Sequence, residues 1–297
     1  MEHISLGKTN SSPDIVVGCI TDYDYAKIEP WVVSLERSGF KGAKVMMCYN
    51  VGVATLEKLR SKGFSIAAHN YDQAGNAFYK LPRAIVVQRF LDLWKLSKLN
   101  GWADQYTNII TTDVKDVIFQ RNPSEFLSEN LGTQGKTISV GCESLKYSQE
   151  PWGNENMFFS FGQDIYAEMK EKLIYNCGTI SGRVDVMTDL FLNIYLLSCN
   201  APIHNADQAA LNVILTMKPW ADQTLFNDVY SGYACQAGTT NDPAKIEAFR
   251  PLLTEPIQPI LDPTDNLVKI RDKVFYLVHQ YDRIPKWKFE LERKYRE

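Results

Sequence analysis

Short apolar runs alternate with amphipathic segments through the first quarter of the chain. Residues 14–21, 43–50 and 64–70 are apolar runs of the length expected of buried strands. Residues 27–39 and 53–63 lie between them, have helical spacing and end at a glycine. This β–α–β–α–β order predicts a parallel sheet with right-handed crossovers.

The clearest helical pattern covers residues 81–99, where Val86, Phe90 and Leu93 recur on one face. A fourth strand is expected at residues 106–114. The later pattern predicts strands at 137–144, 174–182 and 274–282, helices at 184–199, at 205–217 and from 283 to the end, and an extended proline-rich loop at 251–265. The fold class expected is therefore α/β, a mostly parallel central sheet flanked by helices in one large domain over residues 1–297.

Composition excludes some classes of function. The 297 residues are 45% hydrophobic and 23% charged with a formal net charge of −3, which argues against a broad nucleic-acid footprint. No apolar run approaches the ~20 residues that span a bilayer, and the N-terminus has no apolar signal core. The six cysteines form no C-x-x-C pair. We expect a soluble, cytoplasmic protein.

Two acids stand at the end of the fourth predicted strand, in the stretch TTDVKDVIFQRNP at 111–123. Ligands of open α/β sheets bind beyond the C-terminal ends of parallel strands. If the strand ends at Asp113, a tight turn brings Asp116 to the same side. Two adjacent carboxylates repel unless a proton or a cation lies between them, and Mg²⁺ or Mn²⁺ suits such oxygen ligands. The alternative is a turn-capping Asp113 beside a solvated Asp116, and the spacing alone does not decide between them.

The segment around these acids resembles the metal-binding segment of GT-A glycosyltransferases, the nucleotide-diphospho-sugar transferases, in the form D-V-[KR]-D-V-x-F-Q. Residues 277–283, LVHQYDR, are similar to the C-terminal V-H-Q-Y-D-R element of the same enzymes. NCGTISG at 176–182 and NADQAALN at 205–212 match two further segments in the expected order. The resemblance covers residues 110–283 and implies a GT-A type Rossmann-like fold, with a nucleotide-binding half at about 1–120 and an acceptor-binding half with a C-terminal extension at about 121–297.

The resemblance implies a divalent ion that bridges the diphosphate of a nucleotide-sugar. Asp113 and Asp116 match its carboxylate ligands, and His279 matches the histidine that completes the site. A histidine ligand favours Mn²⁺ over Mg²⁺. The alternative for His279, after the apolar run 274–278, is a core histidine bonded to a backbone carbonyl. UDP is the expected nucleotide because it is the commonest carrier in the family, and a glycan hydroxyl is the expected acceptor.

The donor would lie against four further positions. Thr21 and Tyr23, after the first strand, match the loop that holds base and ribose, although a polar turn with an exposed tyrosine explains them nearly as well. Arg89 matches a family Arg-Phe pair, and it either lies at the core edge or reaches a phosphate or the metal-site carboxylates. Gly178 would let the backbone approach the ligand closely, or would mark a bulge. Asp113 would also face the donor.

The acceptor is expected near residues 150–158, EPWGNENMF. Trp152 would stack on a sugar face, and Asn154 and Glu155 would hydrogen-bond its hydroxyls, with Glu155 a second candidate catalytic acid. The alternative is a plain surface loop.

Asp207 is the principal catalytic candidate. Asn205 and Gln208 are interpreted as a capping pair, which places Asp207 in the first turn of a helix, where the helix dipole stabilises an acid. In the family an acid at such a helix start often faces the anomeric carbon. Asp207 would act as general base or stabilise positive charge on the sugar ring, and the sequence leaves inversion and retention open.

Other classes of function compete with a transferase. A phosphohydrolase of the haloacid-dehalogenase type uses D-x-D after the first strand, whereas Asp113 and Asp116 have a wider spacing and follow the fourth strand. A nucleotidyltransferase requires a glycine-rich basic loop after the first strand, and TDYDYAK at 21–27 is not one. A non-catalytic carbohydrate-binding protein would not need the intact set Asp113, Asp116, Asp207 and His279.

Overall fold

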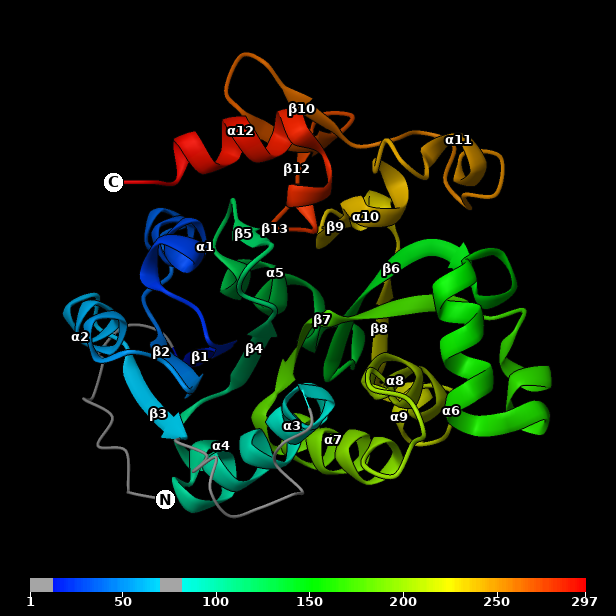
Figure 1. Cartoon of the computed structure of the whole chain (residues 1–297), viewed down its shortest axis with the longest axis horizontal. Coiled ribbons are helices and arrows are strands. Elements are labelled where there is room, and N and C mark those ends of the chain that lie inside the picture. The colour runs from blue at the N-terminus through cyan, green and yellow to red at the C-terminus, as the bar shows by residue number, and fades with distance from the viewer. Residues whose placement is uncertain (1–12, 70–81) are drawn as a thin grey trace.

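A seven-stranded sheet forms the centre of the molecule (Figure 1). The computed structural model describes residues 13–69 and 82–297, so residues 70 and 81, at the ends of a predicted strand and helix, lie outside it. The strand order is β3-β2-β1-β4-β7-β6-β8. The strands are β1 (Asp14–Thr21), β2 (Ala43–Tyr49), β3 (Ser65–His69), β4 (Asn108–Thr112), β6 (Ile138–Lys146), β7 (Leu173–Arg183) and β8 (Thr224–Asn227).

Strand direction follows the predicted pattern with one exception. The first four strands in space, β3 to β4, pair in parallel, as do β6 and β8. Strand β7 runs antiparallel to both of its neighbours, β4 and β6. The prediction of a mostly parallel sheet flanked by helices in one domain is confirmed.

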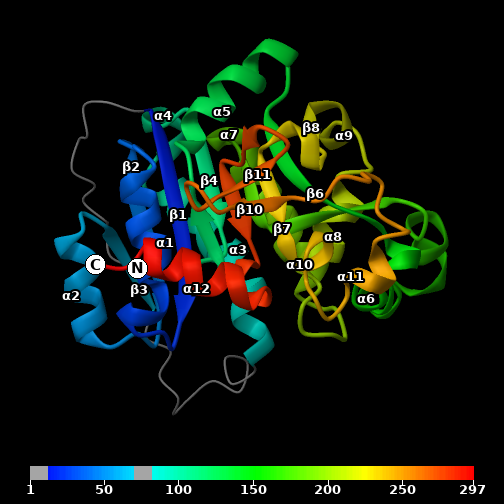
Figure 2. The same ribbon diagram turned by 90° about the horizontal axis from the view of Figure 1, so that it is seen from above.

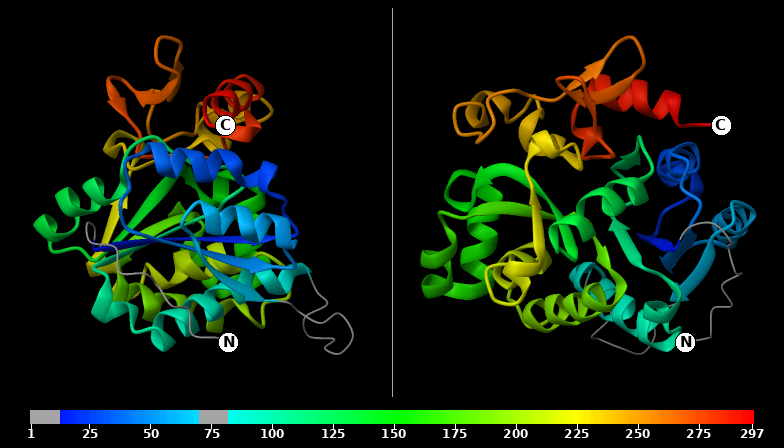
Figure 3. Two further views of the ribbon diagram at one scale, coloured as in Figure 1. Left: turned by 90° about the vertical axis from the view of Figure 1, so that its left-hand side faces the viewer. Right: turned by 180° about the vertical axis from the view of Figure 1, so that it is seen from behind.

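Helices cover both faces of the sheet (Figure 3). Apolar side chains of α1, α2 and α5 pack on one face, and those of α3, α4, α7 and α8 pack on the other. The helices are α1 (Tyr25–Arg37), α2 (Val53–Ser61), α3 (Pro82–Leu99), α4 (Trp102–Gln105), α5 (Pro123–Asn130), α6 (Pro151–Met169), α7 (Val184–Ser198), α8 (Asp207–Ile214), α9 (Trp220–Gln223), α10 (Ala237–Thr240), α11 (Ile246–Phe249) and α12 (Pro285–Lys294). In the described part of the chain, no helix is long and apolar enough to cross a membrane.

Two small sheets carry much of the C-terminal region. The first has the order β5-β13-β9 and the second the order β10-β11-β12. Figure 2 shows α12 lying across α1 and the N-terminal strands. The strands are β5 (Val117–Phe119), β9 (Ala234–Gln236), β10 (Ile260–Asp262), β11 (Leu267–Ile270), β12 (Lys273–Val274) and β13 (Leu277–His279). Short 3-10 helices cover Gly132–Gln134, Tyr147–Gln149, Val229–Ser231 and Tyr281–Arg283.

Two local predictions and one alternative are wrong. The single strand expected at 274–282 is two short strands, β12 and β13, because each pairs with a different sheet. The loop expected at 251–265 contains β10. The segment 150–158 is not a loop but the start of α6: Pro151 occupies the first turn, and the Glu150 carboxylate accepts a hydrogen bond from the Gly153 N–H.

Candidate functional site

Asp113 and Asp116 lie at the two ends of a tight turn. Strand β4 ends at Thr112, and the Asp113 N–H donates a hydrogen bond to the Gly178 carbonyl at 2.9 Å. The chain then turns and continues as β5, which is fully buried. The Asp116 carbonyl accepts a hydrogen bond from the Gln280 N–H at 2.7 Å. Backbone bonds to β7 and to the C-terminal region therefore hold both ends of the turn.

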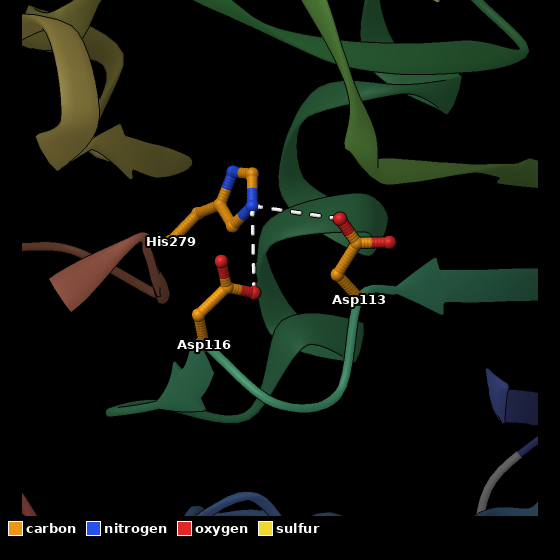
Figure 4. A group of neighbouring side chains, drawn as sticks. All are labelled: Asp113, Asp116 and His279. Atoms are coloured by element: carbon orange, nitrogen blue, oxygen red, sulfur yellow. Dashed lines mark ion pairs between the residues drawn. The ribbon is translucent and has the colours of Figure 1, made fainter. Parts of the chain in front are cut away.

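Strand β13 brings a histidine to this turn. It pairs antiparallel with β5, with His279 opposite Val117. The His279 Nε2 lies 3.6 Å from Asp113 Oδ2 and 3.7 Å from Asp116 Oδ1 (Figure 4). One ligand atom from each of the three side chains lies within 4.8 Å of the others. Two carboxylates and an imidazole at this spacing fit a divalent cation.

A second layer orients the imidazole. The Gln236 Oε1 lies 2.8 Å from His279 Nδ1, so Nδ1 donates the hydrogen bond and Nε2 is left to face the carboxylates. The Gln236 Nε2 in turn donates to the Thr179 hydroxyl at 2.9 Å. Metal-ligating histidines generally have such a partner on the second ring nitrogen.

The electrostatics of the three groups are interdependent. Burial opposes ionisation of Asp113, but Arg89 and His279 lower its pKa well below the ordinary value. Burial raises the pKa of Asp116, with a further contribution from Asp113. Burial alone would lower the pKa of His279, but Asp116 and Asp113 raise it. Positive charge is thus favoured between the two carboxylates, which is the condition a bound cation satisfies.

Arg89 connects the candidate metal site to the candidate catalytic acid. From α3 its Nη1 reaches Asp113 Oδ1 at 2.6 Å, and its Nη2 reaches Asp207 Oδ2 at 3.0 Å. A metal-site carboxylate is one of the partners expected for Arg89, and Asp113 is that partner. The contact of Arg89 with a donor phosphate stays a prediction.

Asp207 is the first residue of α8, in the first helical turn as predicted. The predicted capping pair is wrong, because the N-cap residue is Ala206 and no side chain caps the helix. The Gln208 side chain instead accepts a hydrogen bond from the Cys177 N–H and donates one to Glu143. Burial raises the pKa of Asp207 even though Arg89 lies beside it.

A cleft of about 610 Å³ lies over these groups. Its lining includes, of the predicted site residues, Thr21, Tyr23, Arg89, Asp113, Asp116, Trp152, Gly178, Asp207 and His279. Asn154 and Glu155 are not among the lining residues, and Glu155 is exposed on α6. Trp152 is 46% exposed at the cleft, where an aromatic ring is open to a ligand. The structure therefore brings together all the predicted positions except those two.

Gly178 lies where a side chain would run into the metal-site side chains. A Cβ at this position would lie 2.6 Å from Asp113 Oδ2, 2.9 Å from His279 Cε1 and 3.0 Å from Asn176 Oδ1. The first two distances are shorter than real Cβ atoms show, so only glycine fits beside this cluster.

Sequence reasoning missed a buried acid in the cleft. Glu143 lies on β6, is 7% exposed, and accepts hydrogen bonds from Asn176 Nδ2 at 2.6 Å and Gln208 Nε2 at 3.2 Å. The signal was available, because Glu143 interrupts the apolar run of the predicted strand 137–144, where a carboxylate is costly unless it has partners or a task.

Comparisons with known proteins agree with this architecture. No family model matches the chain, and no curated protein matches it in sequence. Among solved structures it is similar to WbbM, described as a bifunctional glycosyltransferase in its apo structure, with a TM-score of 0.54 and 12% sequence identity. The match covers 98% of this chain and 53% of that chain, so this chain spans about half the length of WbbM. The likeness shows a glycosyltransferase-type fold.

Proposed function

We propose that this chain is a divalent-metal-dependent glycosyltransferase that moves a sugar from a nucleotide-diphospho-sugar to a glycan hydroxyl. The observation that carries the proposal is the Asp113, Asp116 and His279 cluster. It lies in a cleft at the C-terminal end of a parallel strand, where ligands of open α/β sheets bind. The fold shared with a glycosyltransferase supports the same class of reaction.

Asp113, Asp116 and His279 would hold Mn²⁺ or Mg²⁺, which supplies Lewis-acid neutralisation of the departing diphosphate. Mn²⁺ is the first choice because the set contains an imidazole. Thr21 and Tyr23, at the end of β1, would contact the base and ribose of UDP.

Around the sugar, Gly178 has no side chain and would let the donor approach the metal-site side chains closely. Arg89 would bind a donor phosphate or sugar hydroxyl from its position between the two acids. Asp207 would act at the sugar ring, as base or as stabiliser of its positive charge.

On the acceptor side, Trp152 would stack on a sugar face at the cleft. Asn154 and Glu155 remain proposed acceptor and catalytic residues from the sequence. Because neither lines the cleft, a role for them requires an acceptor that extends beyond it along α6.

Two other functions predict different results. A lectin-like protein would be stabilised in a thermal-shift assay by free glycan alone. A phosphohydrolase would release phosphate from simple phosphate esters. We favour the transferase because the carboxylates follow β4 rather than β1 and because the cleft continues from the cluster to Trp152.

Thermal shift with UDP plus Mn²⁺, followed by turnover assays with UDP-sugars, tests the proposal. We expect UDP and Mn²⁺ together to raise the melting temperature more than either alone. Asp113→Asn should remove that synergy and the metal-dependent turnover. Asp164→Asn, an exposed acid on α6, is the matched control and should behave as wild type. Normal turnover by Asp113→Asn would show that the metal assignment is wrong.

A further inference from the structure

Glu143 lies one side chain away from the candidate metal site. The Asn176 Oδ1 accepts a hydrogen bond from the Gly178 N–H at 2.6 Å, and the Asn176 Nδ2 donates to Glu143. A Cβ at Gly178 would meet the side chains of Asp113 and His279. Glu143 is therefore next to the reaction centre but separated from the cation ligands by a neutral amide.

The Glu143 carboxylate is fixed in orientation. Its Oε1 accepts both amide hydrogen bonds, from Asn176 at 2.6 Å and from Gln208 at 3.2 Å. The Thr239 hydroxyl donates to the Glu143 backbone carbonyl at 2.8 Å. Within residues 13–69 and 82–297 no hydrogen bond reaches Oε2, and the side chain lines the cleft. One oxygen is thus occupied, and the other is available to a ligand.

Asp207 is held differently. Its Oδ2 is paired with the Arg89 guanidinium at 3.0 Å, and a carboxylate in an ion pair is a weak proton acceptor because protonation destroys the pair. Among the described residues, only neutral amides hydrogen-bond the Glu143 side chain. Burial raises the pKa of both Glu143 and Asp207 toward the pH at which a general base is most effective, so the two acids differ in their partners and not in the direction of this shift.

We propose that Glu143, and not Asp207, is the general base that receives the proton of the acceptor hydroxyl. This inference rests on the proposed transferase function. The acceptor oxygen bonds to the anomeric carbon of the donor while the bond from that carbon to the phosphate oxygen breaks. The electron pair leaves with the nucleoside diphosphate, and the proton goes to Glu143 Oε2. A single displacement of this kind inverts the anomeric configuration.

The part of the cleft lining around Trp152 fits an acceptor approaching Glu143. Lys245 lies 3.5 Å from Glu150, and both residues line the cleft together with Trp152. A polar pair beside an exposed ring suits a sugar, whose faces are apolar and whose rim carries hydroxyls. The acceptor sugar would lie between Trp152 and Glu143.

The wild-type enzyme gives the first test. It is incubated with Mn²⁺, with UDP-glucose, UDP-galactose or UDP-N-acetylglucosamine, and with p-nitrophenyl glycosides as acceptors, and the product is analysed by proton NMR. We expect the inverted anomer. A retained anomer overturns the inference and leaves the transferase function standing. No turnover with any donor contradicts the transferase function and the inference that depends on it.

Glu143→Gln gives the second test, because the glutamine carbonyl can still accept both amide hydrogen bonds. We expect kcat to fall at least ~100-fold, the scale of general-base catalysis. The donor KM should stay within about threefold, and the thermal shift with UDP and Mn²⁺ should be unchanged. Glu168→Gln, an exposed glutamate on α6, is the control. A Glu143→Gln enzyme that keeps more than about a tenth of wild-type kcat overturns the assignment. If the variant does not fold, a retained anomer formed by the wild type still overturns the inference.

Discussion

The Arg89 guanidinium lies 3.0 Å from the Asp207 carboxylate, although 118 residues separate the two in sequence. The same arginine reaches Asp113 at 2.6 Å, so one cation neutralises an acid from each of two distant segments. The turn that carries Asp113 and the start of α8 are therefore electrostatically joined.

Removal of this cation should destabilise the fold. Arg89→Ala leaves Asp207, whose side chain is 7% exposed, and Asp113 without their shared partner. We expect a loss of about 3 kcal/mol in the free energy of unfolding. This value is at the low end of the losses that follow when a buried ion pair is broken, because Asp113 is partly exposed. Urea denaturation measures the loss.

Lys98→Ala is the control for Arg89→Ala, since Lys98 lies on the same helix in an exposed pair with Asp189. It should change the free energy of unfolding by less than about 0.5 kcal/mol. Saturating Mn²⁺ should recover part of the Arg89→Ala loss. Equal stability of the two variants would mean that the bridge makes no net contribution.

Gly178→Ala should damage the metal site more than the fold. The added methyl would meet Asp113 Oδ2 at 2.6 Å, which forces that carboxylate to move. We expect Mn²⁺ affinity, measured by calorimetry, to fall at least ~10-fold, the scale already seen when outer partners of metal ligands are lost. Gly52→Ala is the control, because nothing lies within 4 Å of the new methyl and its φ is negative. Unaltered Mn²⁺ binding by Gly178→Ala would show that Asp113 is not a ligand.

Gln236→Leu tests the orientation of His279. Loss of the 2.8 Å contact to Nδ1 frees the imidazole to rotate and to change tautomer. We expect Mn²⁺ affinity to fall about 10–100-fold. Gln120→Leu removes a half-buried glutamine that donates hydrogen bonds to the Val268 and Phe275 carbonyls and does not line the cleft, so it should lower stability without changing Mn²⁺ affinity. Equal Mn²⁺ affinities for the two variants would contradict the role of Gln236.

Glu143→Gln should stabilise the protein in a pH-dependent way. Burial raises the folded-state pKa of Glu143, so the folded state binds this proton more tightly than the unfolded state. The wild type therefore loses stability as the pH rises from the unfolded-state pKa through the folded-state pKa, and glutamine avoids that loss. The stability gain from the substitution should be larger at pH 8 than at pH 5 in urea denaturation without ligand. A gain independent of pH would mean that the ionised carboxylate is fully compensated.

The parts of the site that the sequence predicted are those encoded locally or by a motif. The Asp113–Asp116 turn follows from an apolar strand that ends at an acid, and His279 follows from its place in LVHQYDR. The ion pair of Arg89 with Asp207 and the hydrogen bonds from Asn176 and Gln208 to Glu143 depend on which elements meet at the sheet. Neither contact leaves a periodic pattern in the sequence, so neither could be predicted without the structure.

The start of α6 was not predicted, for a different reason. Gly153, Asn154 and Asn156 are poor helix formers, so local propensity does not indicate a helix here. The Glu150 cap, the proline at the first helical position and burial of Met157 outweigh those propensities. Tertiary packing overrides local preference here.

The pairing of β13 with β5 has a consequence for biosynthesis. The turn that carries Asp113 and Asp116 leaves the ribosome well before its third partner, His279, which arrives on β13. A nascent chain can assemble the first four parallel strands long before it can hold a cation with all three side chains. Metal capture by the full set would then wait until residue 279 has been made, and a chain that stops short of it lacks one ligand.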